Sequence, residues 1–118
     1  MLIVDDHRLF AEAVAAILAT DNRFQVVGQA HNGEQAVELA AAEKPDVVLM
    51  DIAMPQLDGV DAAKRIKRKR SSAAVLMLTG SSSSADVARA RDAGAAGYVT
   101  KDRIASELID SIVEVTAK

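Results

Sequence analysis

Short, unbroken apolar runs alternate with longer segments of helical period along this chain, and the alternation limits the folds that it can adopt. Residues 47–50 and 74–78 are apolar without polar alternation, which is typical of strands covered on both faces. Residues 2–4, 24–30 and 98–99 are predicted as further strands. The first of these should be central and the second should lie nearer a sheet edge, because only the second alternates with polar residues.

Five helices are predicted between and after these strands. The first covers about residues 8–19, the second follows a capping box formed by Asn32 and Gln35 and ends at Lys44-Pro45, and the third reaches residue 70. The serines at 81–84 can cap a fourth helix, and Gly94 suits the position after its end. The last helix has a buried stripe consisting of Ile104, Leu108, Ile112 and Val115.

Alternating strands and helices predict an α/β fold: a doubly wound, five-stranded parallel sheet in the order 2-1-3-4-5, with five helices. The 118 residues suffice for one domain, 1–118, and are too few for two. Both ends of the sequence look cut, so we expect a fragment of a longer protein.

Composition excludes several classes of function. The chain has no cysteine, which rules out disulfides and thiolate sites. Its net charge of −3 gives no reason to expect direct binding of nucleic acid, and the basic run 64–70 is interpreted as the solvated side of the third helix. No apolar run approaches the length of a membrane span, so we expect no membrane partner and a cytoplasmic location.

Polar residues gather where the predicted strands end. Asp5 and Asp6 follow the first strand, Asp51 the third, Thr79 the fourth, and Lys101 comes just after the fifth. Ligands of such sheets bind beyond the carboxyl ends of the strands, so we expect these five side chains to converge on one pocket.

Three carboxylates in one pocket repel each other, and a hard divalent cation removes the conflict. Asp5 and Asp6 suit a Mg²⁺ site, and Asp51 could attack a phosphoryl donor as a carboxylate nucleophile. Thr79 could donate a hydrogen bond to one phosphoryl oxygen, and Lys101 could pair with another. Met54-Pro55 and Asp58-Gly59 would shape the loop after the nucleophile.

The same residues, in this order, resemble the response-regulator receiver domain of two-component signalling over essentially the whole chain. The similarity includes Asp5-Asp6, Asp51, Thr79, Lys101 and the Gly94–Tyr98 stretch. Two motifs resemble those of the NarL/FixJ-type, LuxR-like branch: Asp5-Asp6-His7-Arg8-Leu9-Phe10 and Lys101-Asp102. Members of that branch usually carry a C-terminal helix-turn-helix DNA-binding domain, which this sequence lacks; the resemblance therefore implies DNA contact only through that absent domain.

The resemblance implies a role for each residue. Asp51 would receive phosphate from a histidine kinase, while Asp6, Asp51 and the Ala53 carbonyl would bind Mg²⁺ or Mn²⁺ directly and Asp5 largely through water. Thr79 and Tyr98 would be switch residues acting on the surface of the fourth helix, fifth strand and fifth helix. The domain would be a switch and not a turnover enzyme, catalysing only its own phosphotransfer and dephosphorylation.

The sequence departs from the receiver pattern at two positions. Asp102 follows Lys101 where many receivers have a cis proline, so we expect a trans bond there. The small Ala53 leaves water freer access to a phosphoaspartate at Asp51. Separately, Ile109 and Val113 lie off the main stripe of the last helix, where they either complete the core or form a dimerisation surface.

Other interpretations of the same residues remain open. Asp5 alone could cap the first helix, Lys101 alone could be a solvated lysine, and His7 and His31 are interpreted as surface residues with nothing to pair them. The domain could dock or dimerise without phosphorylation, although such a module has no need of all five site residues. A haloacid-dehalogenase-like phosphatase needs an aspartate at position 53, and a flavin carrier would meet repulsion from Asp5 and Asp6.

Overall fold

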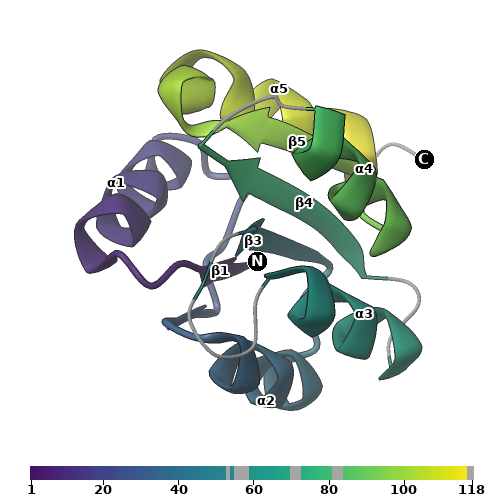
Figure 1. Ribbon diagram of the computed structural model, residues 1–118. Helices are drawn as coiled ribbons and strands as arrows, with labels where there is room; N and C mark the ends of the chain where they lie inside the picture. Colours follow the sequence, from purple (N-terminus) through teal and green to yellow (C-terminus); the bar gives the residue numbers. More distant parts are fainter. Residues whose placement is uncertain (53, 55–58, 70–72, 81–83, 117–118) are drawn as a thin grey trace.

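A parallel β-sheet forms the centre of the computed structural model, which describes residues 1–52, 54, 59–69, 73–80 and 84–116 (Figure 1). Within these residues the sheet has five strands: β1 (Leu2–Val4), β2 (Gly28–Ala30), β3 (Val47–Asp51), β4 (Ala74–Thr79) and β5 (Gly97–Thr100). They lie in the order β2-β1-β3-β4-β5, and every neighbouring pair is parallel. The doubly wound α/β fold predicted from the sequence is confirmed.

Helices cover both faces of this sheet (Figure 1). The helical elements are α1 (Arg8–Ala19), α2 (Gly33–Glu43), α3 (Gly59–Lys69), α4 (Ser84–Asp92), a 3₁₀ turn η1 (Lys101–Arg103) and α5 (Ile104–Thr116). Helices α1 and α5 pack on one face, whereas α2, α3 and α4 pack on the other. None of the helices in the described part of the chain is long and apolar enough to cross a membrane.

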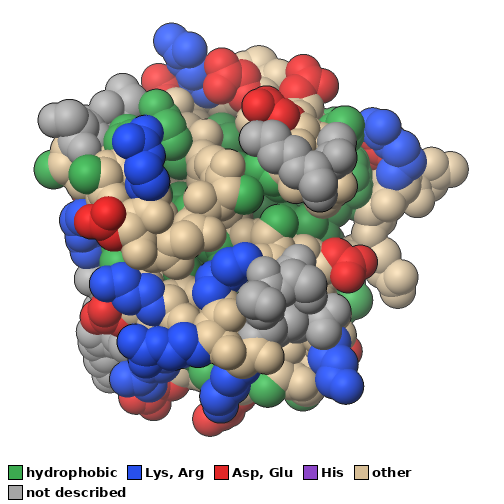
Figure 2. All heavy atoms as spheres, turned by 90° about the vertical axis from the view of Figure 1, so that its right-hand side faces the viewer, with side chains coloured by type: hydrophobic (Ala, Val, Ile, Leu, Met, Phe, Trp, Pro, Cys, Tyr) green, Lys and Arg blue, Asp and Glu red, His purple; other side chains and the backbone are tan. Residues whose placement is uncertain are grey.

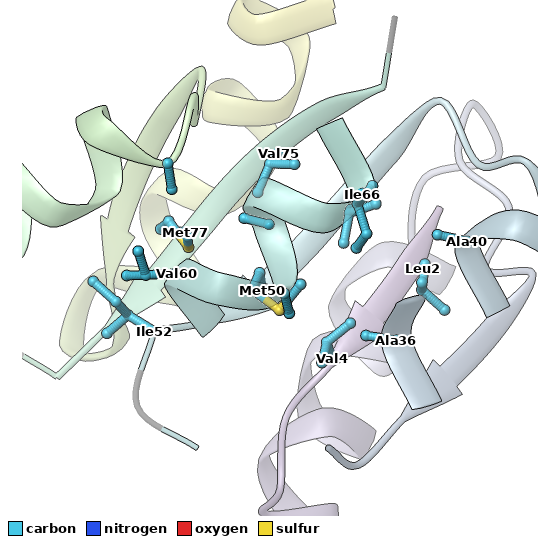
Figure 3. Packing of buried hydrophobic residues seen from close by; sticks show 14 of the residues in the cluster. Leu2, Val4, Ala36, Ala40, Met50, Ile52, Val60, Ile66, Val75 and Met77 are labelled. Atoms are coloured by element: carbon cyan, nitrogen blue, oxygen red, sulfur yellow. The ribbon is translucent and has the colours of Figure 1, made fainter. Parts of the chain in front are cut away.

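The core of the described residues consists of two apolar clusters, one on each face of the sheet. Successive residues of a strand point to opposite faces, so Leu49 belongs to the cluster under α1 and α5, whereas Met50 belongs to the one under α2, α3 and α4. Figure 3 shows the second cluster, in which Leu2 and Val4 of β1 lie beside the small side chains of Ala40 and Ala36 on α2. Strand β3 is buried along its whole length, as its unbroken apolar sequence predicts.

Helix ends follow the predicted local signals. The Asn32 side chain accepts a hydrogen bond from Gln35 N at 2.8 Å, while Gln35 Oε1 accepts from His31 N at 2.7 Å, one residue earlier than in the expected capping box. Lys44 ends α2 in the left-handed region at φ 48°, just before a proline. Gly94 has φ 83° and closes α4 through bonds from the amides of residues 94 and 95 to the Arg91 and Ala90 carbonyls.

Strand β2 is shorter than predicted, because it begins at Gly28 and not at Phe24. Before Gly28 the pairing changes register: Met1 hydrogen-bonds to Gln25 and Val27, whereas Leu2 lies opposite Gly28. One extra residue on the β2 side interrupts the ladder there, as in a β-bulge. An apolar run predicts a tendency to form a strand, but it does not show where the partner strand stays in register.

The last helix carries most of its predicted stripe inward. Leu108, Ile112 and Val115 are buried, and Ile104 is half-buried against the same cluster. Helix α3 likewise turns its apolar side to the core, and its exposed side presents Lys64, Arg65, Arg68 and Lys69. Figure 2 shows Lys and Arg side chains gathered over the lower half of this face of the molecule. The predicted exposure of the basic run is confirmed, whereas residue 70 and the serines at 81–83 lie outside the described residues.

Gly59 begins α3 where the helix meets the end of β3. A Cβ atom built on Gly59 would overlap the Asp51 carbonyl oxygen and lie 2.9 Å from Ile52 Cα. Gly59 N also donates a hydrogen bond to Ile52 O at 3.2 Å. Glycine is therefore required here because two backbones approach closely, and this is a different reason from the turn geometry expected of Asp58-Gly59.

We predict that Gly59→Ala lowers the free energy of unfolding by about 3 kcal/mol, because the new methyl group must displace backbone. Gly80→Ala is the control, since a Cβ there meets nothing within 4 Å. It should change stability by less than about 0.5 kcal/mol. Urea unfolding of both variants measures the difference, and equal small losses would contradict the close approach.

Candidate functional site

Three carboxylates meet beyond the carboxyl ends of the two central strands. Val4 of β1 lies opposite Met50 of β3, so the residues that follow them, Asp5 and Asp51, come level at the same edge of the sheet. One ligand atom each from Asp5, Asp6, His7 and Asp51 lie within 4.8 Å of one another. The structure therefore brings together the acidic residues that the sequence predicted to converge.

Asp5 is fully buried, and it bends the chain between β1 and α1. Its Oδ1 accepts a hydrogen bond from His7 N at 2.8 Å, and its own N–H donates to Ala30 O at 3.0 Å. The N-cap of α1 is His7, whose side chain makes no capping bond. The interpretation of Asp5 as the helix cap is therefore wrong, because Asp5 holds the turn that precedes the helix.

Lys101 supplies a positive charge to this cluster. It begins η1 directly after β5, and its Nζ lies 3.3 Å from both Asp5 Oδ2 and Asp51 Oδ2. Its side chain is 24% exposed, so the interpretation as a solvated lysine is wrong. The Lys101–Asp102 peptide bond is trans, as expected for a residue other than proline.

The donor set at this edge fits a hard divalent cation. Asp5 Oδ2 and Asp6 Oδ1 are buried, and neither makes a hydrogen bond within the described residues. Three carboxylates and one ammonium give the cluster a formal charge of −2, which one divalent cation would neutralise. Mg²⁺ prefers carboxylate oxygens and keeps several waters, and the 27% exposure of the Asp6 side chain leaves room for them. Ala53, whose carbonyl was expected to bind the ion, lies outside the described residues.

Two histidines lie closer to the site than the sequence analysis predicted. His7 is 70% exposed, as expected, but its Nδ1 lies 3.3 Å from Asp5 Oδ1 and 3.2 Å from Asp6 Oδ1. His31 Nδ1 lies 3.1 Å from the Asp5 carbonyl oxygen. The expectation that nothing pairs these residues is wrong. Direct adjacency to Asp6 was a usable signal for His7, whereas His31 comes near only through the pairing of β1 with β2.

The two expected switch residues lie on neighbouring strands. Thr79 ends β4 and is 2% exposed, and it lies one residue beyond Leu78, the partner of Asp51. Tyr98 lies on β5 opposite Met77, and its side chain is 42% exposed. The ring lies at the surface in this structure, between two hollows of about 200 and 220 Å³ lined mainly by residues of α4, β5 and α5.

The two candidate dimer residues, Val113 and Ile109, differ in solvent exposure. Val113 is 38% exposed, and Ile109 is half-buried. Neither belongs to the two apolar clusters, whose α5 members are Ile104, Leu108, Ile112 and Val115. Pro55 and Asp58 of the loop after Asp51 lie outside the described residues, whereas Met54 is buried in the cluster under α2, α3 and α4.

Comparison with known proteins identifies the family. Residues 1–113 match the family model described as the response regulator receiver domain. The transcriptional regulatory protein PdtaR of Mycobacterium tuberculosis is 44% identical over 112 residues, which are 95% of this chain and 54% of PdtaR. DegU of Brevibacillus brevis, also named a transcriptional regulatory protein, is 39% identical over 112 residues, 95% of this chain and 48% of DegU.

The solved signal receiver domain of the response regulator NarL from Mycobacterium tuberculosis has the same fold. It superimposes with a TM-score of 0.92 at 33% identity, covering 99% of this chain and 95% of that one. This chain spans about half the length of the curated relatives named above. The family match over most of the chain and the shared fold lead to one conclusion: the chain belongs to the response regulator receiver domains, and its relatives include NarL-type regulators.

Proposed function

We propose that this domain is a phosphorylation-dependent signalling switch whose phosphoacceptor is Asp51. The observation that carries the proposal is the convergence of Asp5, Asp6, Asp51 and the Lys101 ammonium at one edge of the sheet. A carboxylate oxygen of Asp51 would form the new bond to phosphorus. The bond that breaks is the P–N bond of a phosphohistidine on a histidine kinase, whose imidazole leaves with the electron pair.

The other residues of the site would stabilise charge during this transfer. Lys101 can pair with one phosphoryl oxygen, and the Thr79 hydroxyl can donate to another; charge-assisted bonds of this kind contribute about 1.5–3 kcal/mol each. Asp6 and Asp51, with Asp5 acting through water and the Ala53 carbonyl as a further ligand, would hold the cation. Bound Mg²⁺ or Mn²⁺ would supply charge neutralisation between the carboxylates and the phosphoryl oxygens.

The output of the switch is proposed to be control of transcription by a longer protein. Movement of Thr79 toward a phosphoryl group on Asp51 would open space on β4, and Tyr98 of the next strand would turn inward to fill it. The surface of α4, β5 and α5 would change with it. Coupling between such a site and such a surface is typically about 1–3 kcal/mol. The names of PdtaR and DegU support the transcriptional role, which would act through a DNA-binding output domain.

The metal site leads to a prediction about stability. Mg²⁺ at ten times its dissociation constant should stabilise the wild-type domain by about 1.4 kcal/mol relative to chelator. Asp6→Asn should lose most of this gain, and in chelator it should be more stable than wild type because one repelling charge is gone. Thermal unfolding with Mg²⁺ and with chelator measures both effects.

Glu38→Gln is the matched control, because Glu38 is an exposed carboxylate of α2 outside the acidic cluster. It removes the same charge and should keep the full response to Mg²⁺. An equal Mg²⁺ response in Asp6→Asn and wild type would contradict the proposed cation site.

Phosphorylation is tested directly by intact mass after incubation with Mg²⁺ and a small phosphodonor. The wild-type domain should gain one phosphoryl group that is stable in acid and labile in base, and Asp51→Asn should gain none. If wild type takes up no phosphate, the domain is a phosphorylation-independent docking module instead. Uptake by Asp51→Asn would assign the phosphate to another residue.

We further propose that two copies associate through α5, with Val113 and Ile109 at the contact. Val113→Asp should abolish any phosphorylation-dependent dimer, because a carboxylate would be buried in an apolar contact. Val27→Asp is the control: Val27 is 37% exposed, almost the same as Val113, but it adjoins β2 at the other edge of the sheet. Sedimentation of both variants before and after phosphorylation measures the effect, and equal dimerisation would contradict this surface.

A further inference from the structure

The ammonium group of Lys101 lies over the face of an aromatic ring. Its Nζ is 4.6 Å from the centroid of the Phe10 ring, within the range of a cation–π contact. The same nitrogen lies 3.3 Å from Asp5 Oδ2 and from Asp51 Oδ2. One ammonium group is therefore held between two carboxylates and an aromatic face.

The Phe10 ring also packs against the core. Phe10 lies in the first turn of α1, and its half-buried side chain packs against the cluster under α1 and α5. Ala11, Val14 and Leu18 bury the inner side of α1 against the sheet. The ring therefore extends from a helix that is packed on the sheet, and Asp5 accepts a hydrogen bond in the turn that leads into this helix.

Lysine needs such support more than most side chains do. Its four-carbon stem is flexible, and a strongly hydrated ammonium at 24% exposure can move outward into water. The negative face of the ring attracts the cation and excludes water on that side. The ring thus favours the conformation in which the ammonium donors lie beside Asp51.

We propose that Phe10 is a positioning residue for phosphoryl transfer: its ring holds the Lys101 ammonium where it can pair with a phosphoryl group arriving on Asp51. The inference rests on the proposed function of Asp51. It adds a residue from α1 to a site otherwise built from the ends of β1, β3, β4 and β5. The competing explanation is that Phe10 only fills the core beneath α1.

A fluorinated ring separates these explanations because it keeps the shape of Phe10 and weakens its negative face. The chain contains two phenylalanines, Phe10 and Phe24, so biosynthetic 3,4,5-trifluorophenylalanine incorporation in a Phe24→Leu background labels Phe10 alone. Phe24→Leu is also the packing control. Phe24 belongs to the same cluster and has its own cation, with Arg23 Cζ at 5.4 Å from its ring centroid. It lines a pocket with Met1 and Val47, at the amino-terminal ends of β1 and β3, whereas the site lies at the carboxyl ends of these strands.

The first measurement needs no phosphate. In the Phe24→Leu protein, NMR should show the Lys101 Hε protons shifted upfield by the ring current of Phe10. Phe10→Leu in the wild-type background should abolish the shift, and Phe10→Tyr should retain it. An unshifted Lys101 signal in Phe24→Leu, or an unchanged one in Phe10→Leu, would overturn the contact.

The second measurement is the rate constant for phosphorylation of Asp51 by a small phosphodonor at saturating Mg²⁺. Fluorination of Phe10, or Phe10→Leu, should lower it about threefold to tenfold, in line with the usual strength of a cation–π contact. Phe10→Tyr and Phe24→Leu should stay within about twofold of wild type, because the first keeps the ring face and the second leaves Lys101 untouched.

The outcomes distinguish the two proposals. If wild type accepts phosphate and the fluorinated protein does so at the same rate, the positioning role of Phe10 is wrong while the function of Asp51 stands. If wild type accepts no phosphate, the proposed function itself fails. Should Phe10→Leu unfold, the fluorinated ring decides the question, since it preserves the packing.

Discussion

Repulsion among buried carboxylates is the constraint on which the rest of this structure depends. Asp5 is fully buried and Asp51 is 2% exposed, and both lie beside Asp6 at the edge of the sheet. Burial of like charges is costly, so the fold must hold them against their own repulsion. Lys101 offsets one charge, and the remaining formal charge of −2 fits a divalent cation.

The sheet that bears these charged residues is tightly packed on both faces. β3 is buried along its length between β1 and β4, and the two apolar clusters clamp the sheet from both faces. Gly59 lets the start of α3 approach the Asp51 backbone, and α1 brings the Phe10 ring beneath Lys101. Apolar packing thus offsets the electrostatic cost of the site, and it also orients the charged side chains.

The edge of the sheet near β5 is built differently from its centre. Tyr98 is exposed there, and two hollows flank its ring. Thr79, next to the charged site, pairs with Thr100 of β5, two residues after the exposed Tyr98. The proposed switch would use this pairing to connect a change at Asp51 with the α4–β5–α5 surface.

Much of this protein was determined by its sequence alone. Unbroken apolar runs and helical periods predicted the order of the elements, and strand-end residues predicted that Asp5, Asp6, Asp51 and Lys101 would converge, because parallel strands end at one edge. Only the tertiary structure decided the rest. Four features depend on distances between segments of the chain that pack together. They are the change of register that shortens β2, the approach of His7 and His31 to the site, the close backbone contact that requires Gly59, and the Phe10 ring beneath Lys101. Local pattern encodes what each segment tends to form and which side it buries, whereas contacts between segments arise only when packing fixes their separation.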